Sequence, residues 1–263
     1  HVEVEGKGPG VVFAHGFGGS ARNFRPQLRA LRDAFRVACY DARGHARSEA
    51  PDDFSAYDAE AQVADYAAVA RQAGPGPVVA GGLSMGAATA LAFARRHPEQ
   101  VRALVLISHP AGARRGGGVA SRAEAFADAI EREGLEAAGA RFVWGSDSGL
   151  SEADAKLVRQ GFLEHPPHGL AHTLRAYLAR LPEPEALAPE LAKLDVPALV
   201  VAGEGDEASL PPCRALAEAL PRARLEIVPD AGRVVNLAAP KAFQAILRPF
   251  LDSRAGPPPP ARS

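Results

Sequence analysis

The sequence predicts an α/β protein whose mostly parallel central sheet is flanked by helices and carries an inserted helical cap. Short apolar or β-branched runs alternate with longer segments in which Ala, Leu and Arg recur at helical spacing. This alternation is typical of strands joined by crossover helices. Several of the short runs are apolar throughout, as expected of strands that helices cover on both faces. The 263 residues allow one core built on a single sheet, together with an insertion.

The expected elements follow in order along the chain. Strands are predicted over residues 2–5, 11–14, 35–40, 78–81, 101–107, 198–202 and 225–228. Helices are predicted over residues 22–32, 58–72, 85–96, 212–219 and 240–251. Pro98, Pro211 and Pro240 lie at helix boundaries, where proline ends a helix or begins one.

Residues 111–189 interrupt the alternation. They hold helical patterns over 122–132, 152–162 and 170–181 but no strand pattern, and a stretch of this length is too long for a plain loop. We therefore expect the α/β core at residues 1–110 and 190–253, and the cap at 111–189. Residues 254–263 contain four consecutive prolines, which predict a flexible tail.

Composition argues against several classes of partner. The formal net charge of -1 and the 47% of apolar residues give no electrostatic reason to bind nucleic acid or an anionic membrane, so the expected partner is a small-molecule substrate. Cys39 and Cys213, the two cysteines, predict neither a disulfide scaffold nor a zinc site, and the default compartment is the reducing cytoplasm. No cofactor is expected, because a dinucleotide fingerprint and a metal-ligand cluster are both missing. Oligomeric state is not predicted.

The segment Gly82-Leu83-Ser84-Met85-Gly86 follows an apolar run and precedes an Ala-rich helical pattern. A nucleophile elbow requires this context of strand, turn and helix. Glycines flank the serine because the turn strains its backbone and leaves little room for Cβ atoms. Ser84 is therefore the candidate nucleophile, although the G-x-S-x-G pattern by itself is equally consistent with an ordinary turn.

A second motif, His15-Gly16-Phe17-Gly18-Gly19-Ser20, directly follows the strand predicted at 11–14. With it, the chain resembles the α/β-hydrolase family, in particular the branch that contains lactonases, esterases and meta-cleavage C–C hydrolases. The resemblance implies an oxyanion hole formed by the backbone N–H groups of Phe17 and Met85. For His15, we favour a structural role in which its ring holds the loop over a role in proton transfer.

A third motif, Asp41-Ala42-Arg43-Gly44-His45-Ala46-Arg47-Ser48, follows the strand predicted at 35–40. It resembles the family's D-x-R-G-x-G-x-S turn, with Ala46 in place of the second glycine. In the family this motif is mostly architectural. We therefore expect Asp41, Arg43 and Ser48 to shape a turn near the site and to take no part in catalysis.

The acid and the base of a triad should follow the nucleophile in that order. Residues 199–206 resemble the late strand and G-x-x-D segment that supply the family's acid, which points to Asp206, with Glu204 as its competitor. Residues 229–240 resemble the family's D-A-G-H-x-x-x-x-E-x-P segment, but Arg233 stands at the histidine position. No histidine follows His172, so a shift of register cannot restore the triad.

Arginine cannot serve as the missing base. Its guanidinium stays protonated in proteins and has no acceptor lone pair. Arg233 could instead pair with Asp206, donate to Ser84 or hold an anionic group of a substrate. His109, just after the strand predicted at 101–107, is the alternative base that we weigh. The cap histidines are further candidates, against an ordinary role in loop hydrogen bonding: His165, His168 and His172.

Three functions follow from these residues. The first is a serine hydrolase of a small carboxylic ester, lactone or related acyl compound, weakened or altered because Arg233 replaces the histidine. The second is a lyase or isomerase that uses Arg233 to bind an anionic substrate. The third is a catalytically silent binding protein. Arg233 could also be a substitution introduced into an ordinary hydrolase.

Overall fold

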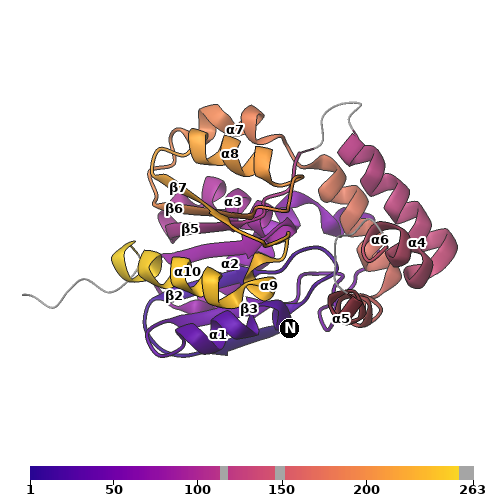
Figure 1. The fold of residues 1–263 in the computed structure, drawn as a ribbon, viewed down its shortest axis with the longest axis horizontal. Helices are drawn as coiled ribbons and strands as arrows, with labels where there is room; N and C mark the ends of the chain where they lie inside the picture. Colours follow the sequence, from indigo (N-terminus) through magenta and orange to yellow (C-terminus); the bar gives the residue numbers. More distant parts are fainter. Residues whose placement is uncertain (113–117, 146–151, 255–263) are drawn as a thin grey trace, which may run out of the picture.

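The computed structural model describes residues 1–112, 118–145 and 152–254. Seven strands form one sheet in the order β1-β3-β2-β4-β5-β6-β7 (Figure 1). Their bounds are β1 Val2–Glu5, β2 Gly10–Ala14, β3 Arg36–Tyr40, β4 Val78–Leu83, β5 Val101–Ile107, β6 Ala198–Gly203 and β7 Ala223–Val228. β1 pairs antiparallel with β3, and the five other neighbouring pairs are parallel. The predicted mostly parallel sheet, with strands at all seven predicted places, is confirmed.

The helices are α1 Arg25–Leu31, α2 Ala59–Ala73, α3 Met85–Arg96, α4 Gly118–Phe142, α5 Glu152–Phe162, α6 Pro167–Ala176, α7 Pro184–Leu191, α8 Leu210–Ala219, α9 Val235–Ala238 and α10 Pro240–Arg254. Short 3-10 helices lie at Ala21–Phe24, Phe54–Tyr57, Pro98–Gln100 and Leu178–Arg180. Two helices were not predicted. α7 starts with one proline and contains a second, Pro189, and α9 has only four residues, so neither has a clear helical pattern.

Side chains that alternate along the strands divide the core into two layers. On β2, Val12 and Ala14 join a cluster that includes residues of α2, α3 and α8. Val11 and Phe13, which point to the opposite face, join a cluster with residues of α1 and α10. Figure 1 shows α8 above β6 and β7, and α1 at the lower side of the molecule next to β3. Because helices cover both faces, the central strands are apolar along their whole length.

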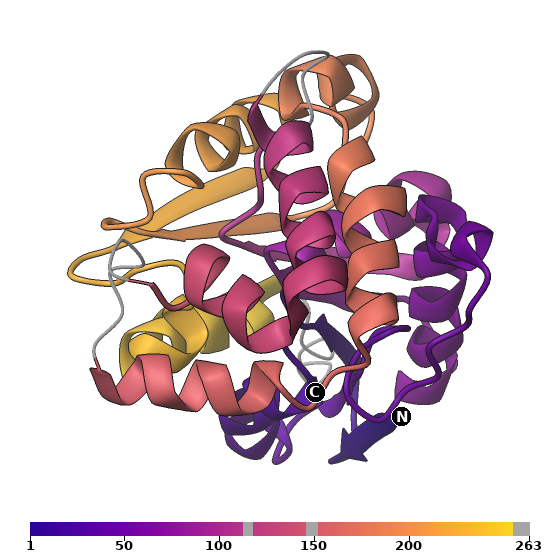
Figure 2. The same cartoon turned by 90° about the vertical axis from the view of Figure 1, so that its right-hand side faces the viewer.

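Helices α4, α5 and α6, which we call the insertion, lie between β5 and β6 in the chain. In space they lie beyond one end of the sheet, and they stand in front of it when the molecule is turned (Figures 1 and 2). The insertion has its own apolar cluster, which includes Phe126, Phe162 and Leu174. α7 instead packs against α8, and its Leu187 and Leu191 belong to the sheet core.

The division into core, cap and tail stays a prediction. From residue 255 onward, the predicted tail lies outside the described residues. Within the part of the chain that the structure describes, no helix has both the length and the apolar character needed to cross a bilayer.

Candidate active site

Four neighbouring strands bring the candidate residues to one edge of the sheet. Ser84 follows β4, His109 follows β5, Asp206 follows β6 and Arg233 follows β7. These strands are adjacent and parallel, so their carboxyl ends share an edge, where open α/β sheets bind their ligands. β2 pairs with β4 on the other side and is followed by the loop that carries Phe17.

The turn at Ser84 has a strained backbone. Ser84 has a φ of 51° and a ψ of -113°, a conformation that costs a residue with a Cβ atom about 1–3 kcal/mol. Its N–H donates to the carbonyl of Ile107 at 2.8 Å, and its own carbonyl accepts the N–H of Ala88 at 3.1 Å in the first turn of α3. Ser84 as a residue is partly exposed. The strained turn thus places it between the end of β4 and the start of α3.

The two glycines beside Ser84 are required by close backbone contacts. A Cβ atom on Gly82 would lie 2.3 Å from the carbonyl carbon of Gly86. One on Gly86 would lie 2.1 Å from the carbonyl oxygen of Ala14, at the end of β2. The spacing of the motif therefore follows from how closely β4, α3 and β2 approach one another.

The loop after β2 lies next to Ser84. A Cβ atom on Gly16 would be 3.5 Å from the Cβ of Ser84, so a side chain of one carbon on this loop would just contact the serine. The N–H of Gly19 closes the loop by donating to the carbonyl of Gly16 at 3.0 Å. The ring of Phe17 packs edge-on against Phe126 of α4, with a centroid distance of 5.6 Å.

His15 holds this loop through both of its ring nitrogens. Nδ1 donates to the carbonyl of Gly16 at 2.7 Å, and Nε2 accepts the N–H of Ala42 at 2.9 Å. Since a carbonyl only accepts and an N–H only donates, the ring is neutral with its proton on Nδ1. Burial lowers the pKa of His15 to about 4. With both nitrogens engaged, His15 fits the structural role that we favoured.

The turn at 41–48 braces the same edge. The carboxylate of Asp41 accepts the N–H of Ala21 at 2.7 Å and the Nε of Arg47 at 2.9 Å. Burial raises the pKa of Asp41, but these hydrogen bonds outweigh burial and hold the pKa below its usual value. Arg43 pairs with Asp65, and the Ser48 hydroxyl donates to the Asp41 carbonyl at 2.5 Å. All these contacts shape the turn.

Arg233 and Asp206 form a long ion pair. The Nη2–Oδ1 distance is 3.3 Å, and Nε lies 3.4 Å from each carboxylate oxygen. Charge-assisted hydrogen bonds in proteins are usually about 2.7–2.9 Å long, so the guanidinium is held loosely. The Asp206 side chain is 5% exposed, whereas the Arg233 side chain is 51% exposed. Arg233 therefore faces its partner on one side and solvent on the other.

Ser108 supports Arg233, a contact that the motifs did not predict. Its hydroxyl donates to the Arg233 carbonyl at 2.8 Å, and its N–H donates to the Val201 carbonyl at 2.8 Å. Ser108 is fully buried and has a φ of 46°, so its backbone is strained in the same sense as that of Ser84. Nothing in the local sequence distinguishes this serine from an ordinary strand end.

Comparison with known proteins decides the family. A family model described as "Alpha/beta hydrolase family" matches residues 11–246. The chain belongs to the α/β-hydrolase family. A Bacillus subtilis relative, provisionally named a 2-succinyl-6-hydroxy-2,4-cyclohexadiene-1-carboxylate synthase, is 34% identical over 92% of this chain and 90% of its own length.

Two solved structures have the same fold as this α/β hydrolase over almost its whole length. One is a thermophilic esterase from Thermogutta terrifontis with malate bound, which has a TM-score of 0.85 and 27% identity over 96% of this chain and 93% of its own. The other is the enol-lactonase from Burkholderia xenovorans LB400, with a TM-score of 0.83 and 27% identity over 95% of each chain.

His109 of this α/β hydrolase is buried two residues after the end of β5. Its Nδ1 donates to the carbonyl of Pro110 at 2.8 Å, which leaves Nε2 as the acceptor of a neutral ring. Burial lowers its pKa to about 4, so it is a weak base. No hydrogen bond joins His109 to Ser84 among the described residues. Its role as an alternative base stays a prediction.

The insertion histidines bind backbone groups or pack against aromatic rings. His165 contacts Gly18 and Ala46, and His168 contacts the Ala50 carbonyl at 2.9 Å. His172 packs against the rings of Phe54 and Tyr57. Contacts of this kind are those expected of histidines that hold loops in place, which is the alternative to proton transfer that we weighed for these residues.

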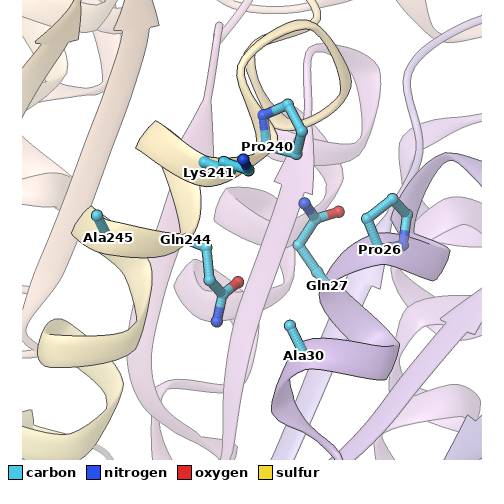
Figure 3. A pocket seen from close by; sticks show the side chains of 7 residues that line it. All are labelled: Pro26, Gln27, Ala30, Pro240, Lys241, Gln244 and Ala245. Atoms are coloured by element: carbon cyan, nitrogen blue, oxygen red, sulfur yellow. The ribbon is translucent and has the colours of Figure 1, made fainter.

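A hollow of about 420 Å³ lies between α1 and α10 of this α/β hydrolase (Figure 3). It is lined by Pro26, Gln27, Ala30, Pro240, Lys241, Gln244 and Ala245. None of the candidate site residues contributes to it. Among the residues that the structure describes, no group of three or more His, Cys, Asp or Glu side chains could hold a metal ion.

Proposed function

We propose that this α/β hydrolase acts on a small carboxylic ester, lactone or related acyl compound, with Ser84 as its nucleophile. The Ser84 hydroxyl would attack the carbonyl carbon, and the backbone N–H groups of Phe17 and Met85 would bind the oxyanion that forms. The observation that carries the proposal is the strained backbone of Ser84, with its φ of 51°. Strained backbone conformations are concentrated at active sites, where they can hold a reactive group in place, and Ser84 combines this strain with a place at the carboxyl end of β4.

Proton transfer is the weak step in this scheme. When Ser84 attacks, its proton needs an acceptor, and in the family a histidine takes it. Arg233 has no lone pair to offer, and its guanidinium already pairs with Asp206. Losing one member of a triad costs a factor of about 10⁴ or more in rate. We therefore expect slow ester hydrolysis, with water as the proton acceptor.

The comparisons support the substrate class at a coarse level. The two structural relatives are named as an esterase and an enol-lactonase, and both names denote enzymes whose substrates contain an acyl carbon. Their likeness covers more than nine tenths of this chain.

The decisive experiment is an Arg233→His exchange. Short p-nitrophenyl esters are assayed with the unchanged chain, with Arg233→His, and with the Ser84→Ala form of each. We expect Arg233→His to raise kcat by about 10²–10⁴, since it supplies the missing base, and Ser84→Ala to abolish the gain. A fluorophosphonate should label Ser84 in the active form.

Two results would contradict the hydrolase proposal. The first is a folded Arg233→His variant with no serine-dependent turnover of esters or lactones. The second is a failure of the fluorophosphonate to attach to Ser84 in either form. Both together would favour a binding protein without catalytic activity.

A second candidate function, a lyase or isomerase with an anionic substrate, is favoured by the exposure of Arg233. Half of its side chain is accessible, and no hydrogen-bond partner of Nη1 is found within the described residues. A carboxylate could take that position. The Bacillus subtilis relative is named as a synthase and not as a hydrolase, which is consistent with non-hydrolytic chemistry.

Calorimetric titration with succinate tests this second candidate. Succinate should bind the unchanged chain but not the Arg233→Gln variant. Dimethyl succinate, which has no charge, should bind neither of the two proteins. Equal binding of succinate to both proteins would exclude Arg233 as the anion site.

A further inference from the structure

His165 joins the insertion to two loops of the core. It lies three residues after the end of α5 and is only 4% exposed. Its Nε2 lies 2.8 Å from the Gly18 carbonyl, in the loop next to Ser84. Its Nδ1 accepts the N–H of Ala46 at 2.7 Å, in the turn at 41–48. One buried imidazole thus bridges three separate segments of the chain.

The two partners define the state of the ring. The Gly18 carbonyl can only accept, so Nε2 must carry a proton. The Ala46 N–H can only donate, so Nδ1 must have a free lone pair. His165 is therefore neutral, with its proton on the opposite nitrogen from that of His15. A second proton on Nδ1 would point at the Ala46 N–H, and this hydrogen bond would be lost.

Both partners lie in backbone that needs support. Ala46 has a φ of 45° although it carries a Cβ atom, a conformation disfavoured for every residue except glycine. Gly18 has a φ of 68°, and a Cβ atom there would lie 2.7 Å from the Phe162 ring of α5. Gly18 directly follows Phe17, so Phe162 of the insertion lies close to the loop that supplies the proposed oxyanion donor.

Several titratable groups surround His165. The ring of His45 lies 5.3 Å away, and that of His15 lies 5.1 Å beyond it. Burial lowers the pKa of His165, as does Arg22, whereas the Gly18 carbonyl, Asp41 and Glu164 act in the opposite direction. The result is a pKa below the usual histidine value.

The two carboxylates near His165, those of Asp41 and Glu164, already have partners. Arg22 and Glu164 pair with each other at 2.8 Å, and Asp41 is engaged with Ala21 and Arg47. Nε2 of His45 is buried and has no partner among the described residues. A charge on His165 would therefore meet no free carboxylate within this group.

We propose that neutral His165 is a positioning residue that fastens the insertion to the loop carrying Phe17, and that its protonation releases this fastening. The effect on catalysis rests on the proposed function, because it requires Phe17 to be an oxyanion donor. The fastening itself does not depend on any activity and can be measured without one.

Two substitutions separate the hydrogen bonds from the ring. His165→Gln keeps one donor and one acceptor but has no proton to gain near neutral pH, whereas His165→Phe keeps a flat ring and removes both hydrogen bonds. The same exchanges at His168 are the matched controls, because His168 lies in the same segment, is 43% exposed at its side chain and contacts Ala50.

The direct measurement is hydrogen exchange at the Ala46 amide, corrected for the intrinsic effect of pH. At pH 7.5, His165→Phe should speed this exchange about tenfold, as expected from the loss of one hydrogen bond, while His165→Gln and both His168 variants stay within about threefold. Between pH 7.5 and 5, exchange should accelerate in the unchanged chain but not in His165→Gln.

Two further signals report on the same fastening. Trp144, the single tryptophan, packs against Phe162 at 5.6 Å, so its emission should change with pH in the unchanged chain and stay constant in His165→Gln. Nitrogen-15 spectra of the imidazole should show the Nε2–H tautomer for His165 at pH 7.5. This test does not depend on whether His165→Phe folds.

The outcomes distinguish this proposal from the proposed function. Slow Ala46 exchange in folded His165→Phe, an acid effect that persists in His165→Gln, or an Nδ1–H tautomer would each overturn the proposal, whatever the activity. If Arg233→His turns over esters, adding His165→Phe should lower kcat more than it changes KM. An unchanged kcat in that double variant, with Ala46 exchange accelerated, would show that the fastening exists but does not position the oxyanion donor.

Discussion

At the scale of single residues, the turn at Ser84 depends on positions where the backbone leaves no space for a side chain. Gly86 faces the Ala14 carbonyl across the junction of α3 and β2. Gly86 belongs to α3 and the Ala14 carbonyl to the end of β2, and both residues are buried. Neither backbone can therefore move aside without displacing the helix or the strand. The glycine of the motif is thus required for packing whether or not Ser84 is a nucleophile.

We expect Gly86→Ala to lower the free energy of unfolding by about 3 kcal/mol or more, because its Cβ atom would lie 2.1 Å from a backbone oxygen. Gly161→Ala is the matched control, since that glycine lies in α5 with nothing within 4 Å of the added atom. It should stabilise by up to about 1 kcal/mol. Urea unfolding followed by circular dichroism measures both, and similar values for the two would contradict the packing argument.

At the scale of elements, α6 is held to α4 by one arginine and three acids. Arg175 contacts Glu124 at 3.1 Å, Asp128 at 2.6 Å and Glu131 at 2.5 Å. The arginine side chain is 22% exposed, while the acids are about half exposed. A hydrogen bond from Arg175 lowers the pKa of Glu131. A network of this kind contributes more to the free energy of unfolding than a single surface ion pair does.

Arg175→Met should destabilise the insertion by about 1–2 kcal/mol, because it leaves three carboxylates close together without a cation. Arg132→Met is the control: Arg132 is 79% exposed and lies 3.7 Å from Asp128, so its loss should cost less than about 0.5 kcal/mol. Unfolding followed by Trp144 emission reports on the insertion. The Arg175 effect should shrink in about 0.5 M salt, which screens the exposed acids, and an effect independent of salt would argue against it.

At the scale of the whole molecule, four buried histidines link stability to pH. Burial lowers the pKa of His15, His45, His109 and His165. These histidines therefore bind protons more readily in the unfolded chain than in the folded chain. The free energy of unfolding must fall as the pH drops below about 6.5, the pKa of histidine in an unfolded chain. Carboxylates with a lowered pKa, such as Glu3, lose their contribution only below about pH 4.5.

The free energy of unfolding should accordingly fall as the pH drops below about 6.5, by about 2 kcal/mol at pH 5 for each of His15 and His109, whose pKa is about 4. Urea unfolding at pH 8, 6.5 and 5 measures this slope. His109→Gln keeps a donor for the Pro110 carbonyl but has no group that titrates. It should therefore lose less free energy of unfolding between pH 6.5 and 5 than the unchanged chain, by the contribution of His109. Stability that stays constant down to pH 5 would show that these rings accept protons in the folded state.

The strands were predictable because the pattern that identifies them lies within each strand's own few residues. A run buried on both faces must be apolar, and β2, β4 and β6 are buried at every position. The direction of β1 was not predictable, since Val2-Glu3-Val4-Glu5 indicates a half-exposed edge strand in either orientation. Motif order placed Ser84, Asp206 and Arg233 on one sheet edge, as the topology confirms, while their chemical roles stay predictions.

Contacts between distant segments could not be predicted. His165 and the Ala46 amide are 119 residues apart, and Ser108 and the Arg233 carbonyl are 125 residues apart. Neither histidine nor serine carries a signal that names such a partner. The positive φ of Ala46 and Ser108 is likewise imposed by surrounding packing, because both residue types ordinarily avoid it.

The place of the insertion in the chain also determines the order in which the sheet can be completed during synthesis. Residues 104–107 of β5 pair with residues 198–201 of β6. At about 5–20 residues per second, the roughly ninety intervening residues take on the order of five to twenty seconds to emerge from a ribosome. During that interval the apolar edge of β5 has no strand beside it, and an unpaired edge is a template for another chain. Nascent chains of this hydrolase on one messenger RNA are therefore open to edge-to-edge association until β6 arrives.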